Sequence, residues 1–396
     1  MRSFQKNLSK FNEAGIRIVG ISVDTPEETR EYMLQKAGYP FTFLSDPKLE
    51  TILRYDLVHA HEIASGKDIS RPAEFLIDPS GTVRWRMVTE NFFVIARPEQ
   101  VLEAAKESIK NTESNQPGKV EQELEQRLKI ICDEAQGTVG LSVIHIESGK
   151  TISINGNSQL PLYSVFKVPL AITVLKDVEE NRLRLGQKIH GIPAEIVPGT
   201  PGNTALWLKP VDYTIEQLLE FSISRSDNTS SDKLLQLVGG PLKVTERMRS
   251  LGFQNLDIHS TIAEFLKSRQ NPNTGSAEDL ARLLVQLYQG KILQPARRDL
   301  LIGFMQRSTI GLHRLRGDLP SGTLVADKTG SGEKDEVTQV AKATNDVGII
   351  TLPAGQGHLA IAVLVSASKL PDAAQEKLIA KLARAAYDAY ATEPAK

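Results

Sequence analysis

A short polar segment divides this chain of 396 residues into two parts. The segment, KNTESNQPGK at Lys110–Lys119, holds a proline and a glycine and no apolar run, a composition typical of linkers. A chain of this length also has room for two domains of ordinary size. We therefore predict one domain at 1–109, a linker at 110–119 and a second domain at 120–396.

The composition argues against several classes of function. The net charge is −1 and no basic stripe with interleaved aromatic residues is present, so nucleic acid is not expected as a partner. Cys132 is the only cysteine and lies in the amphipathic stretch Leu128–Ala135, as a small buried hydrophobe would. The seven histidines show no metal-ligand spacing, so no metal or other cofactor is expected. No apolar run is long enough to span a membrane.

The first domain alternates between strand and helix patterns. Strands are predicted at 15–24, 41–44, 73–78 and 82–87, and helices at 26–37, 49–55 and 98–110. The segment DPSG at Asp78–Gly81 predicts the turn of a hairpin between the last two strands. Strands that alternate with helices and end in a hairpin predict a thioredoxin-like α/β domain.

The same residues resemble the later part of a peroxiredoxin-like domain of the AhpC/TSA type. The resemblance runs through GIRIVGISVDTPEE, FTFLSDP and RPAEFLIDPSGTV, and Pro72 falls where that family often places a cis-proline. Peroxide reduction needs a reactive thiolate, and the strand–helix turn that carries it in that family would precede the first residue here. The chain as written is therefore not expected to be a peroxidase. A misplaced start codon, which the well-kept pattern favours, and a degenerate remnant are the two explanations.

The second domain opens with strong secondary-structure patterns. They predict an amphipathic helix at 120–134, strands at 139–146 and 151–154 and a buried helix at 162–180. The first turn of the buried helix carries Ser164 and Lys167, and their i, i+3 spacing places both on one helix face. A desolvated neutral lysine can act as general base toward a serine hydroxyl, which alone is a poor nucleophile. By itself, the pair also fits a helix N-cap followed by a surface lysine.

Two further motifs follow this pair. Ser226-Asp227-Asn228 lies in a predicted loop between two helices, where a second hydroxyl can relay a proton and Asn228 can orient a substrate. Lys328-Thr329-Gly330 lies in TLVADKTGSG, which predicts an edge strand lining a cleft. Its lysine supplies a positive charge, and its backbone can pair with a peptide-like substrate. Each tripeptide is common by chance, but the three motifs in this order are a strong signal.

With these motifs the chain resembles the superfamily of class A β-lactamases and penicillin-binding proteins, in which SxxK, SDN and KTG recur. The resemblance covers roughly Val120–Tyr390 and includes YSVFKVPLA, SDNTSSDKLLQLVGGP, LPSGTLVADKTG and ATNDVGIITLP. It implies an α/β sandwich in which an antiparallel sheet meets an all-helical subdomain, with the active site between them.

The resemblance also implies catalytic roles. Ser164 would attack the lactam carbonyl after activation by Lys167. Ser226 would protonate the departing nitrogen, supported by the charge of Lys328. The oxyanion hole would come from the backbone N–H groups of Ser164 and Ser331, each worth about 3 kcal/mol.

Substrate binding is implied for a second set of residues. The set comprises Asn228, Thr329, Gly330, Ser331, Arg314 and Trp207. Thr329, Ser331 and Arg314 would hold the substrate carboxylate, with Arg316 as the competitor of Arg314. Trp207 is either an aromatic gatepost of the cleft or a packing residue of the core.

Release of the acyl group needs a glutamate that holds a water, and the matching stretch departs from the family pattern. This stretch, Asp257–Thr274, lacks the glutamate–x–x–leucine–asparagine arrangement, and alignment outward from LGFQNL puts Ile262 at the glutamate's position. Glu264 is the only carboxylate between Asp257 and Glu278. It is therefore the candidate deacylating base, the alternative being a surface carboxylate on a short helix.

Three functions stay open from the sequence. The first is a β-lactamase that works through an acyl-serine, and the second is a penicillin-binding-like peptidase or esterase acting on a peptidoglycan-like peptide. The third is a β-lactam-binding module that releases its acyl group slowly. The N-terminus MRSFQKNLSKFNEAG has no apolar core and is not a secretory signal, so the chain as written is expected in the cytoplasm. If residues are missing upstream, the periplasm or the exterior is expected instead.

Overall fold

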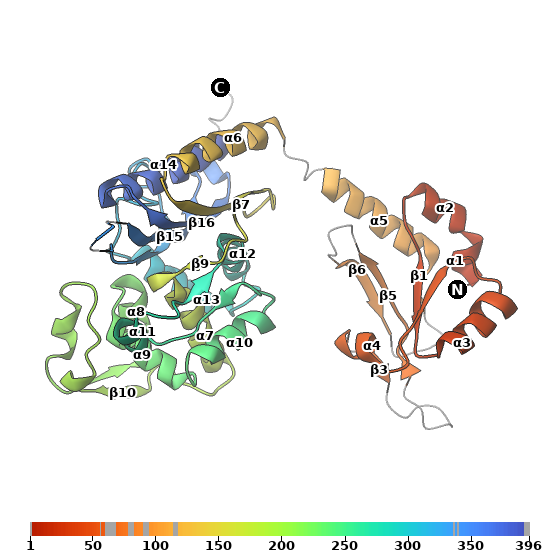
Figure 1. The fold of residues 1–396 in the computed structure, drawn as a ribbon, viewed down its shortest axis with the longest axis horizontal. Helices are drawn as coiled ribbons and strands as arrows, with labels where there is room; N and C mark the ends of the chain where they lie inside the picture. The colour runs from red at the N-terminus through yellow and green to blue at the C-terminus, as the bar shows by residue number, and fades with distance from the viewer. Residues whose placement is uncertain are drawn as a thin grey trace. The chain divides into compact units, whose positions relative to one another are not determined.

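The computed structural model describes residues 2–55, 57–59, 69–77, 83–89, 95–113, 118–335, 337–338 and 340–391. The chain forms two compact units, Met1–Gln116 and Pro117–Lys396, which are described separately (Figure 1). The boundary between the units falls inside the predicted linker, whose limits stay a prediction. Helices occupy both ends of that linker, because α5 (Pro98–Glu113) runs into it and α6 (Lys119–Asp133) begins before it ends.

Three strand pairs and five helices are described in the N-terminal unit. The strands are β1 (Val19–Ser22), β2 (Thr42–Ser45), β3 (Val58–His59), β4 (Ile69–Ser70), β5 (Ala73–Ile77) and β6 (Val83–Val88). The helices are α1 (Arg2–Lys6), α2 (Leu8–Glu13), α3 (Pro26–Thr29), which continues in π-helical turns over Arg30–Lys36, α4 (Glu50–Arg54) and α5. β1 pairs with β2 in parallel, and β5 with β6 antiparallel. The predicted turn at 78–81 lies outside the described residues, and the peptide bond before Pro72 is trans rather than cis.

The core of the N-terminal unit covers one face of the β1–β2 pair. Phe4, Phe11 and Phe41 are buried, and Phe43 packs against them from β2. On the opposite face, Val19 and Ile21 are 46% and 48% exposed. The expected long buried strand at 15–24 is therefore four residues long and covered on one side only, because residues of β1 alternate between the two faces.

The C-terminal unit is built on a five-stranded antiparallel sheet in the order β14-β15-β16-β7-β8. Its strands are β7 (Thr138–His145), β8 (Thr151–Ile154), β14 (Val325–Ser331), β15 (Ala341–Thr351) and β16 (His358–Ser368). Side chains of β16 alternate between two cores: Ile361 and Val363 pack with α6 and α14 (Asp372–Tyr390), whereas Ala362 and Leu364 pack toward the other helices. The sheet is thus buried on both faces.

The helical subdomain packs on the second face of the sheet (Figure 1). Its helices are α7 (Lys167–Glu179), α8 (Ile215–Ser224), α9 (Asn228–Leu237), α10 (Pro241–Ser250), α11 (Ile262–Ser268), α12 (Ala277–Tyr288) and α13 (Pro295–Gln306). The small strands are β9 (Leu160–Pro161), β10 (Lys188–Gly191), β11 (Val211–Thr214), β12 (Leu256–Asp257) and β13 (Thr274–Gly275). No helix among the described residues is long and apolar enough to cross a membrane.

Candidate active site

Ser164 lies on a 3-10 turn, η2 (Tyr163–Phe166), that leads directly into α7. Its neighbours Val165 and Phe166 are fully buried in the core, which anchors the turn, whereas Ser164 itself is partly exposed. Tyr163 has a φ of +46°, a left-handed conformation that costs a non-glycine residue about 1–2 kcal/mol. The buried surroundings therefore hold a strained turn on which Ser164 is partly exposed.

Lys167 begins α7 and is completely buried. Its Nζ lies 2.9 Å from Ser226 O, 3.2 Å from Ser226 Oγ and 2.8 Å from Asn228 Oδ1. No hydrogen bond joins Lys167 Nζ to Ser164 Oγ among the described residues. Burial, reinforced by the positive charge of Lys328, holds the pKa of Lys167 well below its usual value, against the opposing charges of Asp227 and Asp232.

Ser226 connects the two lysines of the site. It has a φ of +54°, and this left-handed backbone lets both its carbonyl and its hydroxyl face Lys167. Lys328 Nζ donates to Ser226 Oγ at 3.0 Å and to Thr329 O at 2.8 Å. Burial lowers the pKa of Lys328 to about 7, although Asp346 and Asp327 oppose the shift. Burial thus disfavours the charged form of both lysines.

The atoms around Lys167 suit both of its protonation states. As an ammonium group it has three N–H donors, one for each of its three neighbouring oxygens. As a neutral amine it keeps two donors, for Ser226 O and Asn228 Oδ1, and its lone pair then faces the Ser226 hydroxyl. A proton can thus pass between Lys167 and Ser226 without any rearrangement of heavy atoms.

β14 carries the KTG motif past Ser164 as an edge strand, which confirms the predicted position of that strand. A Cβ at Gly330 would lie 2.5 Å from Leu162 O and 3.2 Å from Ser164 N, so only glycine allows this approach. Thr329 is buried, and its methyl group lies against Gly311, where a Cβ would be 2.4 Å away. Ser331, one residue beyond Gly330, is exposed.

Arg314 is 6% exposed and holds the end of β14 in place. Its guanidinium donates to Ser331 Oγ at 2.7 Å, to Gly330 O at 3.1 Å and to Asn345 O at 2.9 Å. Its Nε also donates to Glu376 at 3.1 Å. Of the two candidate arginines, Arg314 is thus the one that contacts Ser331.

Arg316 faces a buried carboxylate instead. It pairs with Asp327 on β14 and donates to Val325 O at 2.9 Å. Asp346 on β15 accepts from Leu315 N at 3.1 Å, and burial together with the negative charge of Asp327 raises its pKa well above the usual value. Arg316 therefore fixes β14 from within the protein.

Trp207 is completely buried rather than placed at a cleft entrance. Its Nε1 donates to Asp227 Oδ2 at 3.1 Å, and its ring packs edge-on against Tyr213. Asp227 in turn accepts from Ser230 N at 2.7 Å and so caps α9. This burial fits the core-packing interpretation of Trp207 rather than the gatepost, and the hydrogen bond to Asp227 holds the indole beneath the SDN motif.

Glu264 lies in the first turn of α11 and is exposed. Its Oε2 accepts from Thr261 N at 2.8 Å and from Thr261 Oγ1 at 2.9 Å, while Glu264 N donates to Thr261 Oγ1 at 3.2 Å. This reciprocal capping box accounts for the carboxylate. No hydrogen bond joins Glu264 to Ser164 or Lys167 within the described part of the chain, and its catalytic role stays a prediction.

The ends of the loop that carries α11 are held beside Ser164. β12 and β13 pair with each other. β13 also pairs with β9, whose first residue, Leu160, precedes Tyr163 by three residues. Leu162 N donates to Asn273 O at 2.8 Å, and Asn273 Oδ1 accepts from Ser260 N at 3.1 Å, which closes the neck of the loop. Asn345 Nδ2 donates to Leu162 O at 3.1 Å. Neither Asn273 nor Asn345 was predicted as a site residue, because both act on the backbone and belong to none of the three motifs.

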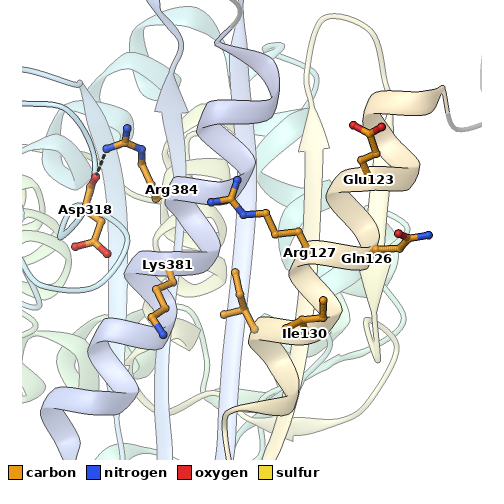
Figure 2. Close-up of a pocket in the computed structure, with 8 residues that line it drawn as sticks. Glu123, Gln126, Arg127, Ile130, Asp318, Lys381 and Arg384 are labelled. Carbon is orange, nitrogen blue, oxygen red and sulfur yellow. Dashed lines mark hydrogen bonds between the residues drawn. The ribbon is translucent and has the colours of Figure 1, made fainter.

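A hollow of about 600 Å³ lies between α6 and α14, on the face of the sheet away from Ser164 (Figure 2). Its lining mixes charges of both signs and carries no nucleophile, as the residues Glu123, Gln126, Arg127, Ile130, Ile131, Asp318, Lys381 and Arg384 show. No cluster of His, Cys, Asp and Glu able to hold a metal is found among the described residues.

The C-terminal unit matches a known protein family over almost its whole length. The profile described as "Beta-lactamase enzyme family" matches residues 122–390. The chain belongs to this family. A second profile, that of the AhpC/TSA family, matches residues 1–86. The family resemblance predicted for each part of the chain is thereby confirmed, and the fold class expected of each part is confirmed with it.

Individual relatives cover the same β-lactamase region. β-Lactamase VEB-1 of Pseudomonas aeruginosa is 31% identical over 276 residues, which are 67% of this chain and 89% of that protein. Extended-spectrum β-lactamase PER-1 of the same organism is 34% identical over 269 residues, 67% of this chain and 86% of that protein.

Solved structures agree with the sequence comparison. A β-lactamase from Chitinophaga pinensis DSM 2588 is 36% identical, with a TM-score of 0.65, and covers 67% of this chain and 99% of its own. A class A β-lactamase from Bacteroides cellulosilyticus DSM 14838 is 28% identical, with a TM-score of 0.64, and covers 69% and 98%. This β-lactamase-family chain therefore contains nearly the whole length of such enzymes.

Proposed function

We propose that residues 120–396 hydrolyse the amide bond of β-lactams through an ester on Ser164. The observation that carries the proposal is the connected arrangement of Lys167, Ser226 and Lys328, buried beside a partly exposed serine on a strained turn of a β-lactamase-family chain. Neither lysine has a carboxylate as hydrogen-bond partner among the described residues. Their environment instead favours the loss and transfer of protons.

Acylation follows from these positions. Ser164 Oγ attacks the lactam carbonyl carbon, and its proton passes to neutral Lys167. The carbonyl oxygen becomes negative and is stabilised by the N–H groups of Ser164 and Ser331. When the C–N bond breaks, the nitrogen takes the proton of Ser226, which Lys167 replaces. Lys328 keeps Ser226 oriented through its 3.0 Å contact.

The substrate carboxylate is assigned to the exposed end of β14. Lys328 supplies positive charge beneath the motif, and Ser331 offers its hydroxyl at the surface. Arg314 contributes its charge through Ser331, since its donors already serve protein acceptors. Asn228 orients the acyl side, with its Nδ2 held by Pro198 O at 2.6 Å.

The release step supports a second candidate, a module that stays acylated. Glu264 is exposed and serves the cap of its own helix, and Ile262 stands at the position of the expected glutamate. Without a carboxylate aimed at the ester, water would attack it slowly. A peptidoglycan-like peptide or ester is the further alternative substrate for the same serine.

The N-terminal unit receives no peroxidase activity in this proposal. Residues 1–109 contain no cysteine, so they carry no peroxide-reducing thiolate. Cys132 lies on α6 of the other unit, and burial raises the pKa of its thiol to about 12. Such a thiol is inert at neutral pH.

Intact-mass spectrometry of the full chain mixed with benzylpenicillin tests the function. A transient adduct together with ring-opened product is expected from a hydrolase. A long-lived adduct without product would instead identify the acylated binding module, and the absence of any adduct would exclude both. Ser164→Ala should abolish the adduct, whereas Ser250→Ala, at an exposed serine that ends α10, should leave it unchanged.

A further inference from the structure

A buried carboxylate joins the helix of the SDN motif to the loop that carries Glu264. Asp232, in the second turn of α9, is 6% exposed. Its Oδ1 accepts from Ile262 N at 2.8 Å and its Oδ2 from Ala263 N at 2.9 Å. These are the first two amides of α11, which have no partner within their own helix. Asp232 thus fixes the start of α11 against α9.

The same carboxylate also interacts electrostatically with Lys167. Asp232 follows Asn228 by four residues, so both side chains lie on one face of α9, and Asn228 Oδ1 already contacts Lys167 Nζ at 2.8 Å. Burial raises the pKa of Asp232, and the negative charge of Glu264 adds to this shift. The amides of Ala263 and Ile262 and the charge of Lys167 act in the opposite direction. The charges acting on Lys167 are Lys328 from β14, Asp227 at the cap of α9, and Asp232.

Asp232 and Glu264 differ in every property that a partner of Lys167 needs. Asp232 is buried and interacts electrostatically with Lys167, whereas Glu264 is exposed and bonded to Thr261. We propose that Asp232 is a positioning residue of the acyl-transfer centre: it adds its negative charge to that of Asp227 in the field that acts on Lys167, and it orders the start of α11. The inference rests on the proposed function of Ser164.

The sign of the expected effect follows from the charge. A negative Asp232 favours the ammonium form of Lys167, and only the neutral amine can accept the proton of Ser164. Acylation therefore rises with pH as Lys167 loses its proton. Removing the charge of Asp232 should move this rise to lower pH by about one unit, the shift typical of one nearby charge.

The test compares Asp232→Asn with Glu264→Gln, a matched removal of one negative charge. The rate constant of Ser164 acylation by a chromogenic cephalosporin is measured by stopped flow from about pH 5 to about pH 9. We expect the acid limb to move down by about one pH unit in Asp232→Asn and to stay in place in Glu264→Gln. Thermal unfolding shows whether each variant is folded, because Asn keeps only one of the two acceptors that α11 uses.

A structural role alone would lower the rate at every pH and leave the limb where it was, and that outcome overturns the proposal. A limb that moves in Glu264→Gln but not in Asp232→Asn also overturns it, as does a wild-type limb below about pH 5. If Asp232→Asn does not fold, Asp232→Glu decides: it keeps the charge, so its limb must coincide with the wild type. Absence of acylation in the wild type at every pH would instead refute the proposed function itself.

Discussion

The two sides of the candidate site are built in opposite ways. On one side, Lys167, Ser226 and Lys328 come from three separate segments and are buried, and both lysines contact Ser226. On the other side, α11 presents Glu264 to solvent, where its carboxylate caps its own helix. The first side can move protons to and from Ser164, whereas the second offers a short helix held from behind by Asp232.

This difference separates the formation of the acyl-enzyme from its release. The buried side keeps two lysines in a place that disfavours their charge, which is typical of groups that exchange protons. The α11 side has its polar groups satisfied by local capping, as in a structural helix end. Fast acylation with slower release is the behaviour that this contrast predicts.

The largest effect is expected from Lys167→Met, which removes the base while nearly keeping the side-chain volume. Acylation of Ser164 by benzylpenicillin should slow by roughly 100- to 10,000-fold, the usual contribution of a general base. The time course of the adduct in intact-mass spectrometry measures this loss directly.

Lys176→Met is the matched control, because Lys176 lies on the same helix and forms a partly buried ion pair with Glu179. It should acylate at the wild-type rate. If Lys167→Met did the same, the buried side of the site would not supply the base and the contrast between the two sides would disappear.

A smaller effect concerns the pH dependence set by Lys328. With its pKa lowered to about 7 by burial, Lys328 loses its charge as the pH rises through neutrality. The charged form holds Ser226 and attracts the substrate carboxylate, so kcat/KM should fall with an alkaline limb near pH 7. Lys328→Arg keeps its charge at every accessible pH and should lose this limb, although the bulkier group lowers the plateau.

Lys342→Arg provides the comparison, since Lys342 is exposed on β15. The pH profile of kcat/KM for Lys342→Arg should keep its alkaline limb near pH 7, measured with a substrate that has no titrating group in this range. A limb that persists unchanged in Lys328→Arg would assign the titration to another group.

The motifs led to the buried residues of the candidate site, whose catalytic roles stay a prediction, but not to the residue that holds α11. Ser164, Lys167, Ser226 and Lys328 could be found because short motifs with fixed chemistry carry them. Asp232 could not, since its function depends on two backbone amides of a distant loop. Trp207 was ambiguous for a similar reason: whether an indole lines a cleft or a core depends on Asp227, which lies 20 residues away.

The fold shows the same limit. The elements predicted from periodicity at 15–110 and at 120–180 occur in the predicted order, and the edge position of β14 was also predicted. The length and cover of β1 were not, because an apolar run does not tell how many of its residues find a neighbouring strand. α5 and α6 also reach into the predicted linker, because its polar residues at either end continue a helical pattern, and the limits of the linker stay a prediction.

The smallest effect is expected from Trp207→Phe, which asks how far the buried side extends. The change removes the hydrogen bond from Nε1 to Asp227 Oδ2 and leaves Asp227 with Ser230 as its remaining partner. Losing one hydrogen bond to a buried carboxylate costs about 1.5–3 kcal/mol, so the thermal transition of the β-lactamase domain should move down while KM stays close to the wild type. Circular dichroism follows the transition, which is assigned to the β-lactamase domain because it coincides with the loss of Ser164 labelling. The control Trp85→Phe, in the N-terminal unit, should leave this transition in place. A raised KM with an unchanged transition would indicate that Trp207 lines the cleft. The buried side of the site would then extend only as far as Asp227.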